Sequence, residues 1–252
     1  VISGGSALYG ETDIARTDRR TMRRLRRSDI SVVFQDATNG LNPVKPIGWQ
    51  IAEAVRLRGG GSGRAAAAEA VDLLARVGMP DPKRRAAEFP YQLSGGMNQR
   101  AMIALAVAGG PKLLIADEAT TALDVTVQAQ ILSLIADLQR EFGMAMIFVT
   151  HDLALVAEIA DRVAVMYAGR VVETAPVRDL YRNPQHPYTA GLLGSLPRVD
   201  TDIETLTIID GEVPPIDAMP PGCAFAPRCG FATSGCKTAP ALAGVGRAHS
   251  TA

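Results

Sequence analysis

Residues 113–116 (LLIA) form a nearly continuous apolar run that is followed directly by two adjacent carboxylates, Asp117 and Glu118. A strand with apolar residues at successive positions is typical of a parallel sheet that is covered on both faces. A second apolar run, residues 144–150 (MAMIFVT), leads directly to His151. Helical patterns separate these runs, and the alternation of strands and helices predicts an α/β layered core.

The rest of the chain continues this alternation and then changes in character. The expected strands are residues 29–34, 112–117, 144–150 and 162–167. The helical patterns cover residues 47–77, with an interruption at the glycine-rich 59–63, and then residues 97–108, 125–142 and 153–159. From about Asn183 onward, frequent prolines and acidic residues indicate a separate C-terminal extension.

Charge and hydropathy argue against two classes of protein. The chain has 26 basic and 26 acidic side chains, so no overall basic field attracts nucleic acid or anionic lipid. The apolar stretch without charge at residues 101–111 is far shorter than the roughly 18 residues that a membrane span needs. Residues 16–27 contain seven arginines and one acid, but without interleaved aromatic residues a solvated helix face is favoured over a nucleic-acid surface.

Several polar residues stand where chemistry is expected. Two carboxylates at the end of a strand, Asp117 and Glu118, suit a nucleotide hydrolase in which the first holds Mg²⁺ and the second orients or deprotonates water. A strand that ends in two acids is also common without catalysis. His151 and Gln35 each follow a strand, at the sheet edge where ligands gather in open α/β folds. The alternative for His151 is a hydrogen-bonded histidine of the core, and Gln35 has the same structural alternative.

The segment Ser94-Gly95-Gly96 precedes a helical pattern. Its hydroxyl and unobstructed backbone N–H groups would form an anion site at the start of the helix. A serine N-cap followed by turn glycines is the alternative interpretation.

Five motifs occur together in a fixed order along the chain. They are Gln35, residues 93–100 (LSGGMNQR), residues 113–118 (LLIADE), residues 121–124 (TALD) and His151. This series resembles the Q-loop, signature motif, Walker B strand, D-loop and H-loop of the ATP-binding cassette (ABC) ATPases, and it covers essentially the whole chain.

The resemblance implies a P-loop NTPase-like ABC ATPase core with a helical subdomain and a cysteine-containing C-terminal extension. The implied segments are residues 1–41 (N-terminal part of the core), 42–110 (helical subdomain ending in the signature helix), 111–182 (core from Walker B to the H-loop) and 183–252 (extension). It also implies an enzyme that hydrolyses ATP with Mg²⁺ as a sandwich of two subunits.

The resemblance assigns roles to single residues. Glu118 would be the catalytic carboxylate, Asp117 would bind Mg²⁺, and His151 and Gln35 would contact the γ-phosphate, the attacking water or the metal. The residues implied to contact the nucleotide or to lie at the dimer interface are Ser94, Gly95, Gly96, Gln99 and Asp124. Ala119, where the family usually has proline, and Asn98, where close relatives often have arginine, are expected to be tolerated.

The phosphate-binding loop of the family, GxxxxGK[ST], has no counterpart in this chain. The only lysines are Lys45, Lys83, Lys112 and Lys237, and none follows a glycine. Because residues 1–14 look like the segment that follows the P-loop helix, and because the first residue is not methionine, we expect an N-terminally truncated sequence. We therefore expect this chain alone to bind ATP poorly and to be inactive.

Three further segments indicate which branch of the ABC family the chain resembles. Residues 35–43 (QDATNGLNP), 183–193 (NPQHPYTAGLL) and 222–236 (GCAFAPRCGFATSGC) resemble the dipeptide and oligopeptide importers and their nickel-importing relatives. The implied function is to energise peptide import at the cytoplasmic face of the plasma (inner) membrane. The implied partners are a second ATPase subunit, two permeases and, indirectly, an extracytoplasmic solute-binding protein, with no nucleic acid. The alternatives are nickel import and an ATPase of a soluble assembly such as phosphonate breakdown.

All three cysteines, Cys223, Cys229 and Cys236, lie in the C-terminal extension. Thiolates at such short spacing suit zinc or an iron–sulfur centre, although either normally takes four ligands. Some relatives in the importer branch carry a [4Fe-4S] cluster here, and a fourth cysteine would follow near the point where this sequence stops. A cluster, zinc and unligated thiols remain the three alternatives.

Overall fold

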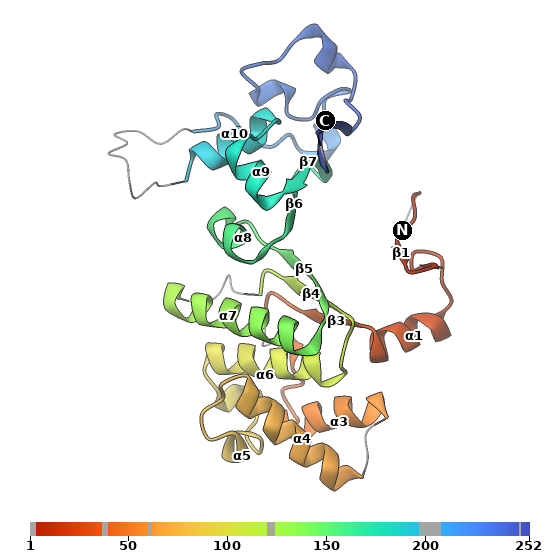
Figure 1. The fold of residues 1–252 in the computed structure, drawn as a ribbon, viewed down its shortest axis with the longest axis vertical. Coiled ribbons are helices and arrows are strands. Elements are labelled where there is room, and N and C mark those ends of the chain that lie inside the picture. Colours follow the sequence, from red (N-terminus) through yellow and green to blue (C-terminus); the bar gives the residue numbers. More distant parts are fainter. Residues whose placement is uncertain (1–3, 37–39, 60–61, 120–123, 197–207, 247) are drawn as a thin grey trace. The chain divides into compact units, whose positions relative to one another are not determined.

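The computed structural model describes residues 4–36, 40–59, 62–119, 124–196, 208–246 and 248–252. The chain divides into two compact units, residues 1–151 and residues 152–252 (Figure 1). This division comes earlier in the chain than the boundary at residue 183 that the sequence suggests, because the strands that follow His151 pack with the C-terminal extension. The finer segment boundaries expected from the sequence stay predictions.

The first unit is built on a parallel three-stranded sheet. The strand order is β3 (Ile30–Val33), β4 (Leu113–Asp117) and β5 (Ala145–Val149). In the register of these strands Val33 lies beside Ala116, and Asp117 lies beside Val149. The strands expected at 29–34, 112–117 and 144–150 are therefore confirmed, and the polar residues that follow them lie at one edge of the sheet.

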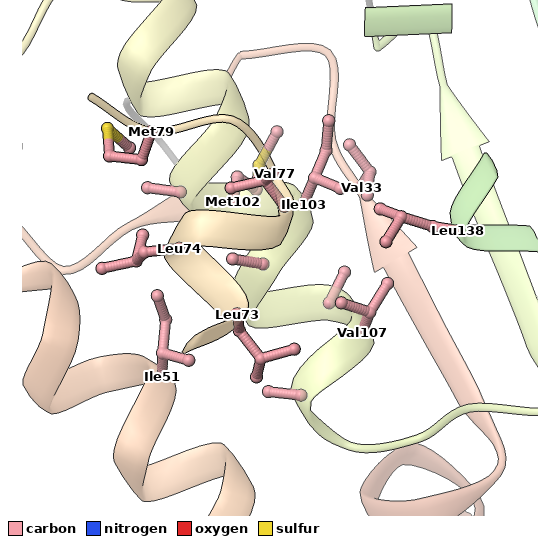
Figure 2. Packing of buried hydrophobic residues seen from close by; sticks show 14 of the residues in the cluster. Val33, Ile51, Leu73, Leu74, Val77, Met79, Met102, Ile103, Val107 and Leu138 are labelled. Atoms are coloured by element: carbon pink, nitrogen blue, oxygen red, sulfur yellow. The ribbon is translucent and has the colours of Figure 1, made fainter. Parts of the chain in front are cut away.

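Helices pack against this sheet through one continuous hydrophobic core. Its helices are α3 (Ile47–Arg58), α4 (Gly63–Arg76), α6 (Gly95–Ala108) and α7 (Val125–Phe142). Side chains of α4 and α6 meet Val33 of β3 and Leu138 of α7 in this core (Figure 2). The helical region expected at 47–77 thus shares its core with the sheet. A short helix α5 (Pro82–Arg85) and a 3₁₀ turn η1 (Pro90–Gln92) connect α4 to α6.

Two glycines adjust the backbone of α3. Gly59 ends the helix with φ = 111°, a left-handed conformation that favours glycine. Gly48 lies so close to the segment after α5 that a Cβ atom there would be 2.7 Å from both the Cβ and the carbonyl oxygen of Ala86. The absence of a side chain at Gly48 therefore permits the close approach of these two segments.

The segment before the sheet forms a short hairpin and a basic helix. The hairpin pairs β1 (Leu8–Tyr9) with β2 (Thr12–Asp13), and α1 (Arg19–Ser28) follows it. Asp18 caps α1 by accepting a hydrogen bond from the Thr21 N–H at 2.8 Å. The arginines of α1 are exposed while Leu25 is buried, as expected for a solvated helix face.

The second unit is an antiparallel sheet with short helices. Its strand order is β6 (Arg162–Tyr167), β7 (Arg170–Pro176), β9 (His249–Thr251) and β8 (Ala243–Gly246). The helices are α8 (Leu153–Ile159), α9 (Val177–Arg182) and α10 (Pro187–Gly194), with 3₁₀ turns η2 (Ile216–Ala218), η3 (Ala226–Arg228) and η4 (Ser234–Lys237). The sequence predicts α8 and β6 but not β7, β8 and β9. No helix within the described ranges is long and apolar enough to cross a membrane.

Candidate functional site

Three of the residues that the sequence singles out meet at the carboxyl edge of the parallel sheet. Gln35 Nε2 donates a hydrogen bond to Glu118 Oε2 at 2.7 Å. His151 Nδ1 lies 3.2 Å from Glu118 Oε1. The parallel register of β3, β4 and β5 brings these side chains together because each follows the end of its strand. Both carboxylate oxygens of Glu118 are thus engaged.

The backbone at Glu118 has an unusual conformation. Its φ of 46° lies in the left-handed region, which costs a residue with a side chain about 1–2 kcal/mol. The Glu118 N–H donates to the Val149 carbonyl at 3.0 Å, and the carbonyl of the following residue, Ala119, accepts from Gln99 Nε2 at 2.5 Å. Two hydrogen bonds therefore bracket the strained residue and hold it in place.

Asp117 is the last residue of β4 and is exposed at the same edge. Carboxylate and amide oxygens are the donors that Mg²⁺ takes from proteins, and Mg²⁺ usually completes its shell with waters and substrate phosphates. Within the described residues no three side chains of histidine, cysteine, aspartate or glutamate group around a common point. The edge therefore fits a cation held by Asp117 and Gln35 together with phosphate oxygens, rather than one enclosed by protein ligands alone.

The signature segment forms the start of α6. Ser94 is its N-cap, and the hydroxyl accepts from the Met97 N–H at 3.4 Å. A Cβ atom at Gly95 would meet no atom of the described residues within 4 Å, whereas one at Gly96 would lie 3.3 Å from Val127 Cγ1. The backbone is therefore open at Gly95. The structural interpretation as an N-cap is thus confirmed, and the same geometry leaves N–H groups available to an anion.

Gln99 lies on the same helix, yet its surroundings differ from those expected. The sequence assigns it to nucleotide binding, but the side chain is 3% exposed and its amide donates to the Ala119 carbonyl. Nothing in the residue pattern indicates this contact, because the acceptor is a backbone atom. A role for Gln99 as a nucleotide ligand stays a prediction, whereas its amide has a partner inside the protein.

Asp124 directly precedes the first residue of α7. Its Oδ1 accepts from the Val127 N–H at 2.9 Å, which makes Asp124 the N-cap of the helix. The preceding D-loop residues, 121–123, lie outside the described residues. The expected place of Asp124 at a dimer interface stays a prediction.

The three cysteines are free thiols in the second unit. The Cys223 N–H donates to the Cys236 carbonyl at 2.9 Å, and Cys236 Sγ accepts from the Thr233 N–H at 3.4 Å. Cys223 and Cys229 pack against the hydrophobic cluster of this unit. Because no group of three or more metal ligands occurs in the described part of the chain, these residues do not fit an assembled iron–sulfur or zinc site.

The second unit contains a buried carboxylate that no sequence pattern indicates. Glu173 on β7 is 0% exposed and accepts from the Gln185 N–H at 2.8 Å, the His186 N–H at 3.0 Å and His249 Nε2 at 2.7 Å. Burial by itself raises the pKa of Glu173, but the Thr189 hydroxyl together with the Gln185 N–H, His249 and the His186 N–H outweighs burial and holds the pKa below its ordinary value. Glu173 thus joins β7, the start of α10 and β9.

The histidine at this junction has a structural role at the start of a helix. His186 is the N-cap of α10, with Pro187 as the first helical residue. His186 Nδ1 accepts from the Tyr188 N–H at 3.1 Å. Burial lowers the pKa of His186, although the nearby Glu173 opposes that shift, so the neutral form that can accept this bond is favoured.

In comparison with known proteins, each of the two units matches a family model of transporter proteins. Residues 2–121 match the family model described as "ABC transporter", and residues 172–236 match "Oligopeptide/dipeptide transporter, C-terminal region". A protein of Brucella melitensis biotype 1 named as a peptide import ATP-binding protein is 56% identical over 248 residues, which is 95% of this chain and 73% of the relative. A similarly named protein of Brucella abortus (strain 2308) is 51% identical over 92% of this chain and 70% of its own length.

Solved structures of cassettes also resemble the chain. A dimeric ATP-binding cassette in a post-hydrolysis state, bound to ADP and Pi, superposes with a TM-score of 0.62 at 28% identity, covering 70% of this chain and 75% of that one. A subunit of an ABC transporter complex from Clostridium perfringens superposes with a TM-score of 0.61 at 28% identity, covering 72% of this chain and 69% of that one.

Proposed function

Since the chain belongs to the ABC transporter family of ATPases, we propose that it is the ATP-hydrolysing subunit of an importer for dipeptides and oligopeptides. The contact of Gln35 and His151 with the two oxygens of Glu118 carries this proposal, because it holds the carboxylate at the strand ends where ligands of open α/β sheets bind. The match of residues 172–236 favours import over phosphonate breakdown. Nickel remains the alternative solute, since other subunits select the cargo.

In the proposed reaction Glu118 accepts a hydrogen bond from the attacking water and directs it at the γ-phosphate of ATP. A positioned general base of this kind contributes about 10²–10⁴-fold to a rate. Gln35 and His151 hold the carboxylate, and a water must share or replace one of these contacts. Asp117 and Gln35 would hold Mg²⁺, which when bound neutralises charge on the phosphate oxygens.

The second nucleotide contact comes from the start of α6. In this proposal Ser94, Gly95 and Gly96 bind the γ-phosphate of ATP held by a second ATPase subunit, and Asp124 lies where the two subunits meet. The open backbone at Gly95 supports this role because exposed N–H groups at a helix N-terminus favour anions.

The exposed side chains of Val44, Lys45 and Trp49 form the surface that would receive a permease. Trp49 on α3 is 47% exposed and Val44 is 73% exposed, and Lys45 Nζ lies 4.8 Å from the centre of the Trp49 ring. Exposed aromatic and aliphatic side chains of this kind are typical of interface centres. We expect residues 41–57 to lie near the contact with a permease, at the cytoplasmic face of the inner membrane. Copurification of the permeases from detergent tests this, and recovery of soluble partners only would contradict it.

The substitution Glu118→Gln tests the proposed chemistry in the complete protein assembled with its permeases. The variant should bind ATP but hydrolyse it about 10²–10⁴-fold more slowly, because the amide cannot accept a proton from water. Glu158→Gln, the same change at an exposed position on α8, is the matched control and should retain the wild-type rate. Brisk hydrolysis by Glu118→Gln would contradict the assignment.

A further inference from the structure

We propose that Gln99 is a positioning residue for Glu118, which it directs by holding the carbonyl group of Ala119. The proposal rests on the proposed function, because it takes Glu118 as the carboxylate that acts on water. In this proposal Gln99 acts inside its own subunit and affects the rate of the chemical step. It does not contact the nucleotide directly.

The first support is the position of the two hydrogen bonds around Glu118. The Glu118 N–H is held by Val149 of β5 at 3.0 Å, and the carbonyl of the next residue is held by Gln99 of α6 at 2.5 Å. The Cα atoms of Glu118 and Ala119 lie between these two anchors. Holding the backbone on both sides limits the directions in which the Glu118 side chain can leave it, and that direction determines whether the carboxylate reaches Gln35 and His151.

The second support is the conformation that must be held. Glu118 has φ = 46°, which a residue with a side chain leaves readily unless its surroundings oppose the change. A relaxation of φ would rotate the carboxylate away from Gln35 Nε2 and His151 Nδ1. The bond from Gln99 opposes this rotation through Ala119, because it holds the carbonyl of the residue that follows Glu118.

The third support is the burial of the hydrogen bond itself. Ala119 is 1% exposed and Gln99 is 3% exposed. A buried carbonyl needs a donor, and Gln99 Nε2 supplies it to the Ala119 carbonyl. Loss of this bond would leave the carbonyl unsatisfied inside the protein, next to Glu118 in the chain.

The test is Gln99→Met in the complete ATPase with its permeases. Methionine has a similar length and volume but no N–H, so it removes the hydrogen bond while filling the space. A net hydrogen bond of ordinary strength corresponds to a fall in kcat of about 3–10-fold, with the KM for ATP within about twofold of wild type. A raised KM with unchanged kcat would overturn the proposal and favour direct nucleotide binding by Gln99.

A double-mutant cycle separates positioning from a general loss of structure. If Gln99 acts through Glu118, adding Gln99→Met to Glu118→Gln should lower the residual rate no further, since the base is already gone. A fall by the same factor in both backgrounds would overturn the proposal. Hydrolysis retained by Glu118→Gln alone would refute the proposed function, whereas full activity of Gln99→Met beside an inactive Glu118→Gln would refute only this inference.

The neighbouring residue offers a matched control. Asn98 is also buried on α6, and its Nδ2 donates to the Pro90 carbonyl at 3.0 Å. Asn98→Leu should lower stability by a similar amount and leave kcat unchanged; a fall in kcat equal to that of Gln99→Met would overturn the proposal. If Gln99→Met does not fold, Gln99→Asn keeps an amide but is one methylene shorter, and the same fall in kcat is expected from it. An unchanged kcat in Gln99→Asn would then overturn the proposal.

Discussion

The buried carboxylate of Glu173 permits a quantitative prediction for Glu173→Gln. The carboxylate accepts three hydrogen bonds, from two backbone N–H groups and from the imidazole of His249, and it is 0% exposed. Glutamine has the same shape but only one acceptor oxygen. Its NH₂ group must replace the other oxygen and then faces a donor, so at least one buried N–H loses its acceptor.

The expected loss follows from these contacts. A hydrogen bond to a charged group contributes about 1.5–3 kcal/mol, and a buried donor without an acceptor costs about 1–3 kcal/mol. The substitution removes the charge from three bonds and leaves one donor unsatisfied. We therefore expect the free energy of unfolding of the second unit to fall by about 3–5 kcal/mol, the range found when one partner of a buried charged pair is removed.

Hydrogen exchange measured by mass spectrometry locates the effect. Peptides that cover β7 and β9 should lose protection in Glu173→Gln, whereas the first unit should not. The only tryptophan, Trp49, lies on α3, so the urea midpoint of its fluorescence reports the first unit and should be unchanged. Glu212→Gln, at an exposed position, is the control. A loss below about 1 kcal/mol, or equal losses in both units, would refute the reasoning.

Two further predictions concern pH and packing. Because the pKa of Glu173 in the folded protein lies below its ordinary value of 4.5, its contribution to stability should be complete above pH 4.5 and should be lost as the pH falls through the folded pKa. Exchange of β7 amides measured against pH should show this dependence in wild type and not in Glu173→Gln. Gly48→Ala should destabilise the first unit by about 1–3 kcal/mol, because the new Cβ would lie 2.7 Å from Ala86. Gly63→Ala, whose Cβ would meet no atom of the described residues within 4 Å, should not change the midpoint of the same urea titration of Trp49 fluorescence.

The parallel sheet and the meeting of its polar residues could be predicted from the sequence. Continuous apolar runs indicate buried parallel strands, and parallel strands bring the residues after them to one edge. For that reason Gln35, Glu118 and His151 are found in contact as the sequence suggests. The start of α6 at Ser94 follows in the same way from the preference of serine for the N-cap.

The remaining features depend on contacts that no local pattern records. Gln99 bonds to a backbone carbonyl, and every residue type offers the same acceptor, so the sequence names no partner. Glu173 places a charged residue at a buried position of β7. The alternation of apolar and polar residues that indicates a strand is therefore interrupted there. β9 has three residues, too few for a periodic signal, and its pairing partner β7 lies far away in the chain.

That separation has a consequence for the order in which the second unit forms. β9 pairs with β7, and the bond between His249 and Glu173 spans 76 residues. At a synthesis rate of about 5–20 residues per second, roughly 4–15 s pass between the synthesis of Glu173 and that of His249. During this interval β7 has no β9 to pair with. Throughout this time the edge of β7 can pair with another chain, and an ionised carboxylate on its inner side discourages such pairing. During synthesis Glu173 thus discourages the pairing of β7 with other chains, and in the folded unit the same side chain bonds to His249 of β9.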